Sequence, residues 1–246
     1  MSPHDKVGES LFNGWPYEEP ERKFVARVVK DGMVFFDVGA NLGIYTLIAA
    51  KRVGLSGSVH SFEPSPVECS KLSRNIRFNR LTNVVINQVA VGDLNKEITL
   101  KMYADGWGAY NTIGHAVEVD APFSEIAVKQ VTLDTYIHDR EIKRVDFIKI
   151  DVEGAEQKVF HGGGTLVWPR LRPIVMVEFS DRRTGPLGYQ ARELWSWLAG
   201  FNYRWFQINQ SDGGLSPAEM KQQYSYDNLV GVPDEKIVDL SALIGC

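Results

Sequence analysis

The stretch VFFDVGANLGIYT, residues 34–46, decides the fold of this 246-residue chain. Its apolar first half has the composition of a parallel strand that is covered on both faces. Two glycines follow, Gly39 and Gly43, and glycine lets the chain turn sharply and lets a ligand approach the backbone. The pattern then predicts a helix over residues 44–53, whose free N–H groups would favour an anionic group above the turn.

A second apolar stretch, SVHSF, is expected to form the next parallel strand, and it precedes Glu63 and Pro64. Ligands of open α/β sheets bind at the carboxyl ends of the strands. The Glu63 carboxylate would therefore lie beside the glycine turn, where it can accept hydrogen bonds from both hydroxyls of a ribose, and Pro64 is expected to contact the same ligand. A helix is expected over residues 66–78. A third strand is expected over residues 84–91, and Val89 and Ala90 near its end would contact the base of a bound nucleoside.

Two cofactors suit this arrangement, a dinucleotide and S-adenosylmethionine. The dinucleotide fingerprint GxGxxG needs three glycines, whereas the turn here reads GANLG and no third glycine follows. Asp37, directly before the turn, would repel a pyrophosphate but attract the ammonium and sulfonium charges of S-adenosylmethionine. S-adenosylmethionine is therefore the predicted cofactor, and an NAD-dependent oxidoreductase is the alternative. The residues expected to contact the cofactor at this turn are Asp37, Gly39, Ala40, Asn41 and Gly43.

Four blocks of sequence together resemble the FkbM family of S-adenosylmethionine-dependent methyltransferases. The blocks are DVGANLGIYT at 37–46, SVHSFEPSP at 58–66, the spacing of Leu72, Asn75 and Asn79, and FIKIDVEGAE at 147–156. The resemblance spans residues 34–180 and implies a class I methyltransferase fold, a Rossmann-like α/β sheet of seven strands with helices on both faces. It also implies O-methylation of a hydroxyl on a sugar, a polyketide or a similar metabolite.

The chain is expected to form a single methyltransferase domain over residues 1–246, because its length leaves no room for a second full domain. Residues 1–32 would form an N-terminal arm and helix. Residues 94–144 interrupt the alternation of strands and helices with strand-like segments, including residues 127–137, so they are predicted to be a β-rich insertion between the third and fourth strands that caps the substrate.

Aromatic and polar residues in two of these segments are candidates for substrate contact. In the arm they fit a lid or plain core packing equally well, and they are Phe12, Trp15 and Tyr17. In the insertion they could bind a hydroxyl-bearing acceptor or simply pack a hairpin, and they are Trp107, Tyr110, Asn111 and His115.

Carboxylates at the ends of the later strands are the candidates for catalysis. A fourth strand over residues 147–150 would end at Asp151, Glu153 follows, and a fifth strand would end at Glu178. A hydroxyl acceptor must lose its proton, so a general base near the acceptor would accelerate transfer. Asp151, Glu153 and Glu178 are the predicted catalytic residues, and Asp151 could also contact the cofactor. Plain helix-terminus and loop-anchoring roles remain open for Glu153 and Glu178, as does a divalent cation held by all three, although no metal-ligand spacing is present.

The composition of the chain limits the kinds of partner that can be expected. With 27 basic and 31 acidic residues the net charge is −4, which disfavours nucleic acid, including an RNA methyltransferase on the same fold. The two cysteines lie far apart, no apolar run approaches the roughly 20 residues of a membrane span, and no signal peptide is evident. A cytoplasmic enzyme acting on a small-molecule or glycan acceptor is therefore predicted. A protein that binds the cofactor without catalysis, as a partner in a complex, is a second alternative.

Overall fold

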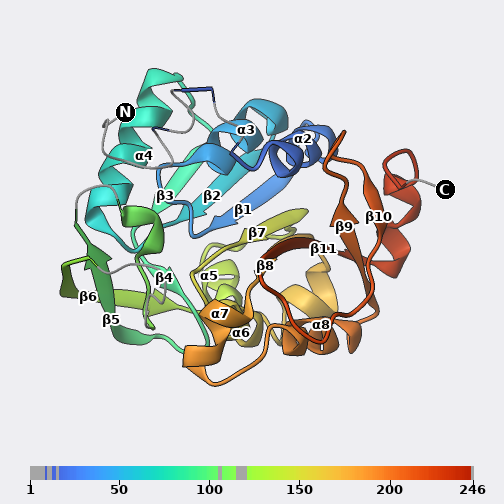
Figure 1. The fold of residues 1–246 in the computed structure, drawn as a ribbon. Coiled ribbons are helices and arrows are strands. Elements are labelled where there is room, and N and C mark those ends of the chain that lie inside the picture. Colours follow the sequence, from blue (N-terminus) through green and yellow to red (C-terminus); the bar gives the residue numbers. More distant parts are fainter. Residues whose placement is uncertain (1–8, 10–12, 15–16, 105–106, 115–120, 245–246) are drawn as a thin grey trace.

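The computed structural model describes Glu9 and residues 13–14, 17–104, 107–114 and 121–244. A mostly parallel sheet forms its centre (Figure 1). The strands of this sheet are β1 (Val34–Val38), β2 (Ser58–Phe62), β3 (Val84–Asn87), β7 (Phe147–Ile150), β8 (Ile174–Phe179), β9 (Tyr203–Ile208), β10 (Leu215–Pro217) and β11 (Asp227–Pro233).

The strand order of this sheet is β10-β9-β11-β8-β7-β1-β2-β3. Strands β3, β2, β1, β7 and β8 run parallel, and β11 lies antiparallel between β8 and β9. Without β10 the sheet has seven strands, five of them parallel neighbours, in agreement with the mostly parallel sheet expected for a class I methyltransferase. The sheet has eight strands rather than the seven expected, because Leu215–Pro217 pairs with β9. A three-residue strand that ends at a proline carries no periodic pattern from which it could be predicted.

Helices cover both faces of the sheet, as Figure 1 shows. One face carries α2 (Glu19–Val28), α3 (Ile44–Val53) and α4 (Pro66–Phe78), and the other carries α5 (Leu133–Asp139), α6 (Glu156–Gly162) and α8 (Arg192–Ala199). The division follows the alternation of side chains along a strand. In β1, Phe35 packs with the core beneath α2 and α3, whereas Phe36 packs with the core beneath α5, α6 and α8.

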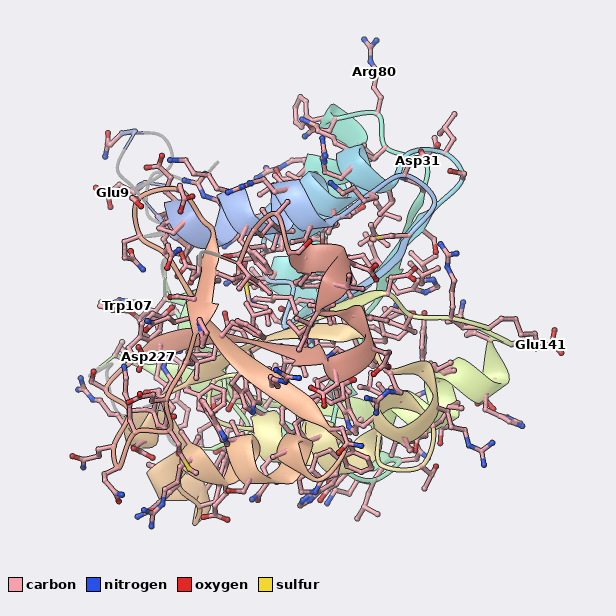
Figure 2. The ribbon with its side chains drawn as sticks, turned by 90° about the vertical axis from the view of Figure 1, so that its right-hand side faces the viewer. Glu9, Asp31, Arg80, Trp107, Glu141 and Asp227 are labelled. Carbon is pink, nitrogen blue, oxygen red and sulfur yellow. The ribbon has the colours of Figure 1, made fainter. Side chains whose placement is uncertain are left out.

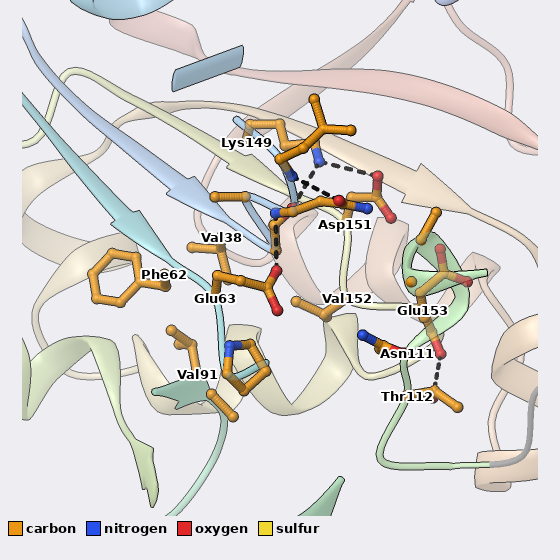
Figure 3. A pocket seen from close by; sticks show the side chains of 18 of the residues that line it. Val38, Phe62, Glu63, Val91, Asn111, Thr112, Lys149, Asp151, Val152 and Glu153 are labelled. Atoms are coloured by element: carbon orange, nitrogen blue, oxygen red, sulfur yellow. Dashed lines mark hydrogen bonds and ion pairs between the residues drawn. The ribbon is translucent and has the colours of Figure 1, made fainter. Parts of the chain in front are cut away.

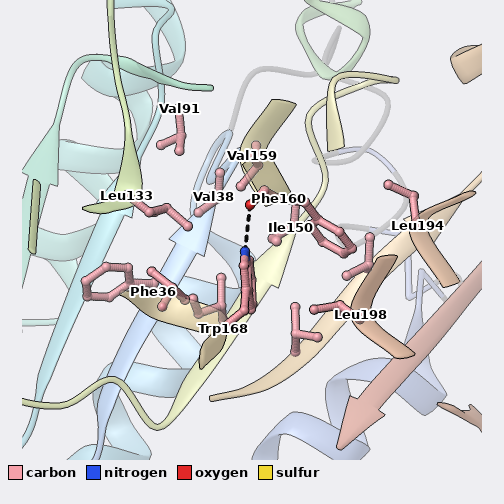
Figure 4. Packing of buried hydrophobic residues seen from close by; sticks show 14 of the residues in the cluster. Phe36, Val38, Val91, Leu133, Ile150, Val159, Phe160, Trp168, Leu194 and Leu198 are labelled. Carbon is pink, nitrogen blue, oxygen red and sulfur yellow. Dashed lines mark hydrogen bonds between the residues drawn. The ribbon is translucent and has the colours of Figure 1, made fainter. Parts of the chain in front are cut away.

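The larger core is built around Trp168, which is fully buried in the short π-helix η2 (Val167–Leu171). Its indole N–H donates a hydrogen bond to the backbone oxygen of Phe160 at 2.7 Å, so the one polar atom of the ring is satisfied (Figure 4). Leu194 and Leu198 of α8 pack into the same cluster. Burial of side chains of this size stabilises the fold by roughly 1.5–3 kcal/mol each.

A second sheet stands beside the main one. Its strands are β4 (Ala90–Val91), β5 (Lys96–Tyr103) and β6 (Phe123–Val131), in the order β4-β6-β5. The third strand predicted over residues 84–91 is therefore two strands, because the chain leaves the main sheet after Asn87 and Ala90 pairs with Gln130 instead.

The predicted insertion is β-rich, and residues 127–131 of its second strand-like segment belong to β6, but the rest of that segment was wrong in type. Residues 133–137, expected to be strand-like, belong to α5. Thr132 caps this helix, because its Oγ1 accepts a hydrogen bond from the backbone N–H of Thr135 at 3.1 Å. The cap is a local signal that outweighs the apolar alternation of the segment.

Two exposed residues with positive φ, Arg80 and Glu141, follow the ends of α4 and α5, and both project away from the molecule (Figure 2). Among the described residues, no helix combines the length and the apolar character needed to cross a membrane.

Candidate active site

The turn after β1 requires glycine at two positions. Gly39 has φ +80°, and a Cβ there would lie 1.8 Å from the backbone oxygen of Asp151. Gly43 has φ +95°, and a Cβ there would lie 2.3 Å from Cδ1 of Leu72. The contact at Gly39 is with backbone and excludes any side chain, whereas at Gly43 the positive φ disfavours one and the contact is with the end of the Leu72 side chain. The turn thus lies against the end of β7 on one side and against α4 on the other.

The side chain of Asn75 holds this turn from α4. Its Nδ2 donates to the backbone oxygen of Leu42 at 2.8 Å. Asn41, at the centre of the turn, has φ +49°, and its Oδ1 accepts from the N–H of Leu42 at 2.6 Å. The Leu72 and Asn75 positions of the sequence pattern are therefore structural supports of the turn.

Glu63 lies at the end of β2, beside the turn (Figure 3). One carboxylate oxygen accepts from the N–H of Asn41 at 2.8 Å and the other from the N–H of Ser65 at 2.9 Å. The side chain is only 6% exposed, and burial raises its pKa to about 7. Each oxygen keeps a lone pair, so the carboxylate can also accept two hydroxyl groups from a ligand.

An open cavity lies above these residues, and its empty space, including the part open to solvent, is about 940 Å³. Nine of the ten residues predicted to bind the cofactor line it: Gly39, Ala40, Asn41, Gly43, Glu63, Pro64, Val89, Ala90 and Asp151.

The structure corrects the position of Asp37. Its carboxylate is 1% exposed and does not line the cavity, because side chains alternate along β1 and position 37 faces α3. One oxygen accepts from Oγ1 of Thr46 at 2.6 Å, and the other has no hydrogen-bond partner among the described residues. Burial raises the pKa of Asp37. Asp37 therefore supports the turn from below and is not part of the cavity wall.

Lys149 is a buried cation that sequence reasoning missed. It lies next to Asp37 across the pairing of β1 with β7, and its Nζ lies 3.0 Å from Oδ2 of Asp151. Burial lowers the pKa of Lys149, but the negative charges of Asp151, Asp37 and Glu18 outweigh burial and raise it. The available signal was a lysine inside the apolar strand FIKI, since a lysine in such a place is almost always paired.

Asp151 lines the cavity as an ionised carboxylate (Figure 3). Burial would raise its pKa, yet the positive charges of Lys149 and Arg183 and the hydrogen bond from Lys149 hold it below the usual value. A carboxylate held in this way is a weak base, and it is better suited to orienting a neighbouring group.

The two other predicted catalytic carboxylates share one arginine. Arg183 Nη1 lies 3.1 Å from Glu153 and 2.6 Å from Glu178. Glu153 lines the cavity, but Glu178 is 3% exposed and does not. Glu178 lies at the end of β8, one residue before Phe179, but its side chain turns toward Arg183 and not into the cavity. Burial, together with the charges of Asp151 and Glu153, raises the pKa of Glu178.

A further carboxylate, Glu156, fixes the loop that carries Glu153. Its Oε1 accepts from the N–H of Val152 at 3.0 Å and from the N–H of Gly154 at 3.2 Å. Tyr189 donates to its other oxygen at 3.2 Å. Burial raises the pKa of Glu156. Sequence reasoning gave this residue no such role, because Tyr189 is 33 positions away along the chain.

The N-terminal arm reaches the cavity through Tyr17 and Glu18. Glu18 accepts from the hydroxyl of Tyr45 at 2.7 Å and from the hydroxyl of Tyr226 at 2.9 Å. Burial and the charge of Asp151 raise its pKa. The sequence carried no sign of Glu18, because its partners are 27 and 208 positions away. Of the aromatic residues considered for a lid, Tyr17 lines the cavity, and the other two, Phe12 and Trp15, lie outside the described residues.

The loop between β5 and β6 forms the opposite wall. Asn111 lines the cavity together with four of its neighbours in the loop: Gly108, Ala109, Thr112 and Ile113. Thr112 Oγ1 donates to the backbone oxygen of Glu153 at 3.0 Å, which joins the loop to the end of β7. Trp107 and Tyr110 pack against each other, with ring centres 5.5 Å apart, and do not line the cavity. His115 lies outside the described residues.

Lys149 and Arg183 lie between the carboxylates that a divalent cation would need. In the part of the chain that the structure describes, no group of three or more His, Cys, Asp or Glu side chains is arranged to hold a metal ion.

Comparisons with a family model and with curated proteins agree on one family. Residues 37–205 match the model of the methyltransferase FkbM domain. The 31-O-demethyl-FK506 methyltransferase FkbM of Streptomyces tacrolimicus is 30% identical over 173 residues, which cover 60% of this chain and 65% of that protein. Methyltransferase 1 of Beauveria bassiana is 26% identical over 168 residues, covering 62% of this chain and 67% of that protein. The match thus spans about two thirds of the length of these relatives.

Solved structures with related topology are more distant. A SAM-dependent O-methyltransferase from Thermotoga maritima is 15% identical, covers 89% of this chain and 66% of that chain, and has a TM-score of 0.46. A SAM-dependent methyltransferase from Aquifex aeolicus is 13% identical, covers 87% of both chains, and has a TM-score of 0.47. The fold class given above depends on the strand order of this chain and not on these superpositions.

Proposed function

Because this chain belongs to the FkbM family of methyltransferases, whose cofactor is S-adenosylmethionine, we propose that it methylates a hydroxyl group of a sugar, a polyketide or a similar metabolite. The observation that carries the proposal is the position of Glu63 beside a glycine turn, in a cavity whose far wall is the loop between β5 and β6. The name of the Streptomyces relative, a 31-O-demethyl-FK506 methyltransferase, supports transfer to oxygen.

The residues of the cavity fit the cofactor. Gly39 and Gly43 leave the backbone of the turn open to a ligand, since neither carries a side chain, and at Gly39 none would fit. Glu63 would accept the two ribose hydroxyls, and Ala90 would lie against the adenine. When bound, S-adenosylmethionine supplies a methyl group on a positively charged sulfur, and its transfer is an in-line displacement. The protein then has mainly to hold the acceptor oxygen in line with that group.

On the acceptor side, Glu153 is the proposed general base and Asp151 the proposed orienting carboxylate. Glu153 lines the cavity, and Glu156 holds its loop by two backbone hydrogen bonds. Asp151 is kept ionised by Lys149, so it would accept a hydrogen bond without taking the proton. Glu178 would act at a distance, by fixing Arg183. A base in this position contributes roughly 10²- to 10⁴-fold to the rate.

Calorimetric titration with S-adenosylhomocysteine tests the cofactor. Binding in the micromolar range is expected. If no heat of binding is detected at millimolar ligand, the cofactor assignment is rejected. A parallel titration with NADH tests the oxidoreductase alternative, and a filter-binding assay with RNA across salt concentrations tests a nucleic-acid substrate.

Transfer of a tritiated methyl group to small acceptors tests the reaction. The panel pairs each hydroxyl compound, such as a macrolide, a methyl glycoside or a catechol, with its O-methyl ether. Labelling of the hydroxyl member alone supports O-methylation, and the Glu153→Gln variant should lose about 10²-fold or more in rate with unchanged affinity for S-adenosylhomocysteine. Labelling of an amine-bearing acceptor instead would overturn transfer to oxygen.

A further inference from the structure

One end of the cavity holds more negative than positive charge. Glu18 and Asp151 line it, Asp37 lies beneath it, and Lys149 is the cation whose charge acts on all three carboxylates. Arg183 also acts on Asp151, but it is paired with Glu153 and Glu178. Glu18, Asp37 and Asp151 thus share the ammonium group of Lys149 in a partly buried site. Such a site is electrostatically incomplete and favours a ligand that brings positive charge.

The position of this end relative to Glu63 indicates which part of a ligand would reach it. Strand β1 pairs with β2 on one side and with β7 on the other. Glu63 follows β2 and Asp151 follows β7, so the two carboxylates flank the glycine turn from opposite sides. If Glu63 holds the ribose, as the proposed function requires, the amino-acid portion of the cofactor extends toward Asp151 and Glu18.

We propose that Glu18 binds the ammonium group of the methionine portion of S-adenosylmethionine, so that the N-terminal arm supplies one wall of the cofactor site. This inference rests on the proposed function. Neither of the other carboxylates is as well placed for the contact. Asp37 is buried beneath the turn, and Asp151 already holds Lys149 at 3.0 Å.

Glu18 is fixed in place for such a role. Two phenol hydroxyls, from Tyr45 and Tyr226, donate to its two oxygens, which leaves one lone pair on each oxygen for an ammonium donor. The charged and titratable groups that face it are these two tyrosines, Tyr17, Asp151 and Lys149. Its pKa is raised, first by burial and then by Asp151, and a bound cation would relieve both effects.

The backbone at Glu18 supports the same conclusion. Its φ of +44° is in the left-handed region, which residues with a side chain rarely adopt. Strained conformations of this kind persist where the surroundings fix them, and they cluster at binding sites. Here the two tyrosine contacts hold the carboxylate at the cavity while α2 begins at the next residue.

The test compares two nucleosides that differ only at the amino-acid end. S-adenosylhomocysteine carries the ammonium and carboxylate groups, and 5′-methylthioadenosine lacks both. In calorimetry, we expect Glu18→Gln to weaken the binding of S-adenosylhomocysteine by roughly tenfold or more, because a charge-assisted hydrogen bond is lost. The affinity for 5′-methylthioadenosine should not change. The matched control is Glu19→Gln on the next residue, which pairs with Lys23 on the surface and should change neither affinity.

Two results would overturn the inference: Glu18→Gln binds both nucleosides more weakly by the same factor, or it binds both as tightly as the wild type does. Failure of the wild-type protein to bind S-adenosylhomocysteine would instead reject the proposed function, and the inference with it. If thermal unfolding shows that Glu18→Gln does not fold, Tyr226→Phe takes its place. That variant removes one hydrogen bond to Glu18. It should weaken the binding of S-adenosylhomocysteine severalfold and leave the affinity for 5′-methylthioadenosine unchanged. If the wild type and the variant bind S-adenosylhomocysteine equally well, the inference is wrong.

Discussion

The backbone N–H of Asn41 donates to Oε2 of Glu63 at 2.8 Å, and this contact joins the turn after β1 to the end of β2. The carboxylate proposed to bind the ribose is therefore also a support of the loop proposed to bind the rest of the nucleoside. Binding and local stability share one side chain at this point, so the effects of mutation have to be separated by measuring both.

Replacement of Glu63 by alanine should weaken the binding of S-adenosylhomocysteine at least tenfold. It should also lower the free energy of unfolding by about 1–3 kcal/mol, because the buried N–H groups of Asn41 and Ser65 lose their acceptor. Calorimetry and urea denaturation measure the two effects. An unchanged affinity in a folded variant would show that the ribose is held elsewhere.

The affinity for S-adenosylhomocysteine should depend on pH near neutrality. Burial raises the pKa of Glu63 to about 7, and only the ionised carboxylate can accept both ribose hydroxyls. Below that pH the dissociation constant should rise by about tenfold for each unit, and above it the constant should level off. Titrations between about pH 5.5 and 8.5 measure this, and Glu63→Gln should abolish the inflection. An inflection that survives in Glu63→Gln belongs to another group.

Alanine in place of Gly39 should prevent correct formation of the turn, since its Cβ would meet the backbone oxygen of Asp151 at 1.8 Å. The matched control is Gly188→Ala, where φ is similar, +88°, but no atom lies within 4 Å of the new Cβ. The control should cost only the backbone strain, about 1–2 kcal/mol. Thermal unfolding of both variants isolates the steric part, and equal losses would refute the close packing of the turn against β7.

Methionine in place of Lys149 should destabilise the fold by about 3–5 kcal/mol, because buried carboxylates lose their cation. The contribution of Asp151 to the pH dependence should also change sign. In the wild-type chain, the lowered pKa of Asp151 contributes stability that is lost as the pH falls. In Lys149→Met, burial would raise the pKa of Asp151 and would raise the already raised pKa of Asp37 further, so the stability of the variant relative to the wild type should fall as the pH rises. Denaturation at about pH 5 and pH 8 measures the slope, with Lys23→Met, at an exposed pair, as the control.

Most of the doubly wound scaffold could be predicted because its signals are local. The strand before the glycine turn and the helix after it were confirmed, as were the next strand and helix α4. In each of these elements the apolar residues recur with the spacing of one type of secondary structure, and the residues at its ends mark the boundary. At α4, for example, Ser65 precedes Pro66 and its Oγ accepts from the N–H of Glu68 at 3.2 Å.

The rest could not be predicted because it depends on contacts between distant parts of the chain. Nothing near Glu18 in the sequence indicates that Tyr226 will donate to it. The pattern placed Asp37 before the turn and Glu178 at the end of a strand, but it does not tell to which face or neighbour each side chain turns. The ion pairs that set the charge of Asp151 and Glu178 are likewise visible only in the folded chain.

The two ends of the β5–β6 hairpin lie side by side. The chain enters the hairpin just after Ala90–Val91, and the hairpin ends at Gln130 and Val131, which pair with those two residues. Entry and exit are thus adjacent. A change in the length of the loop at the tip of the hairpin therefore need not displace the strands that carry the glycine turn and Glu63.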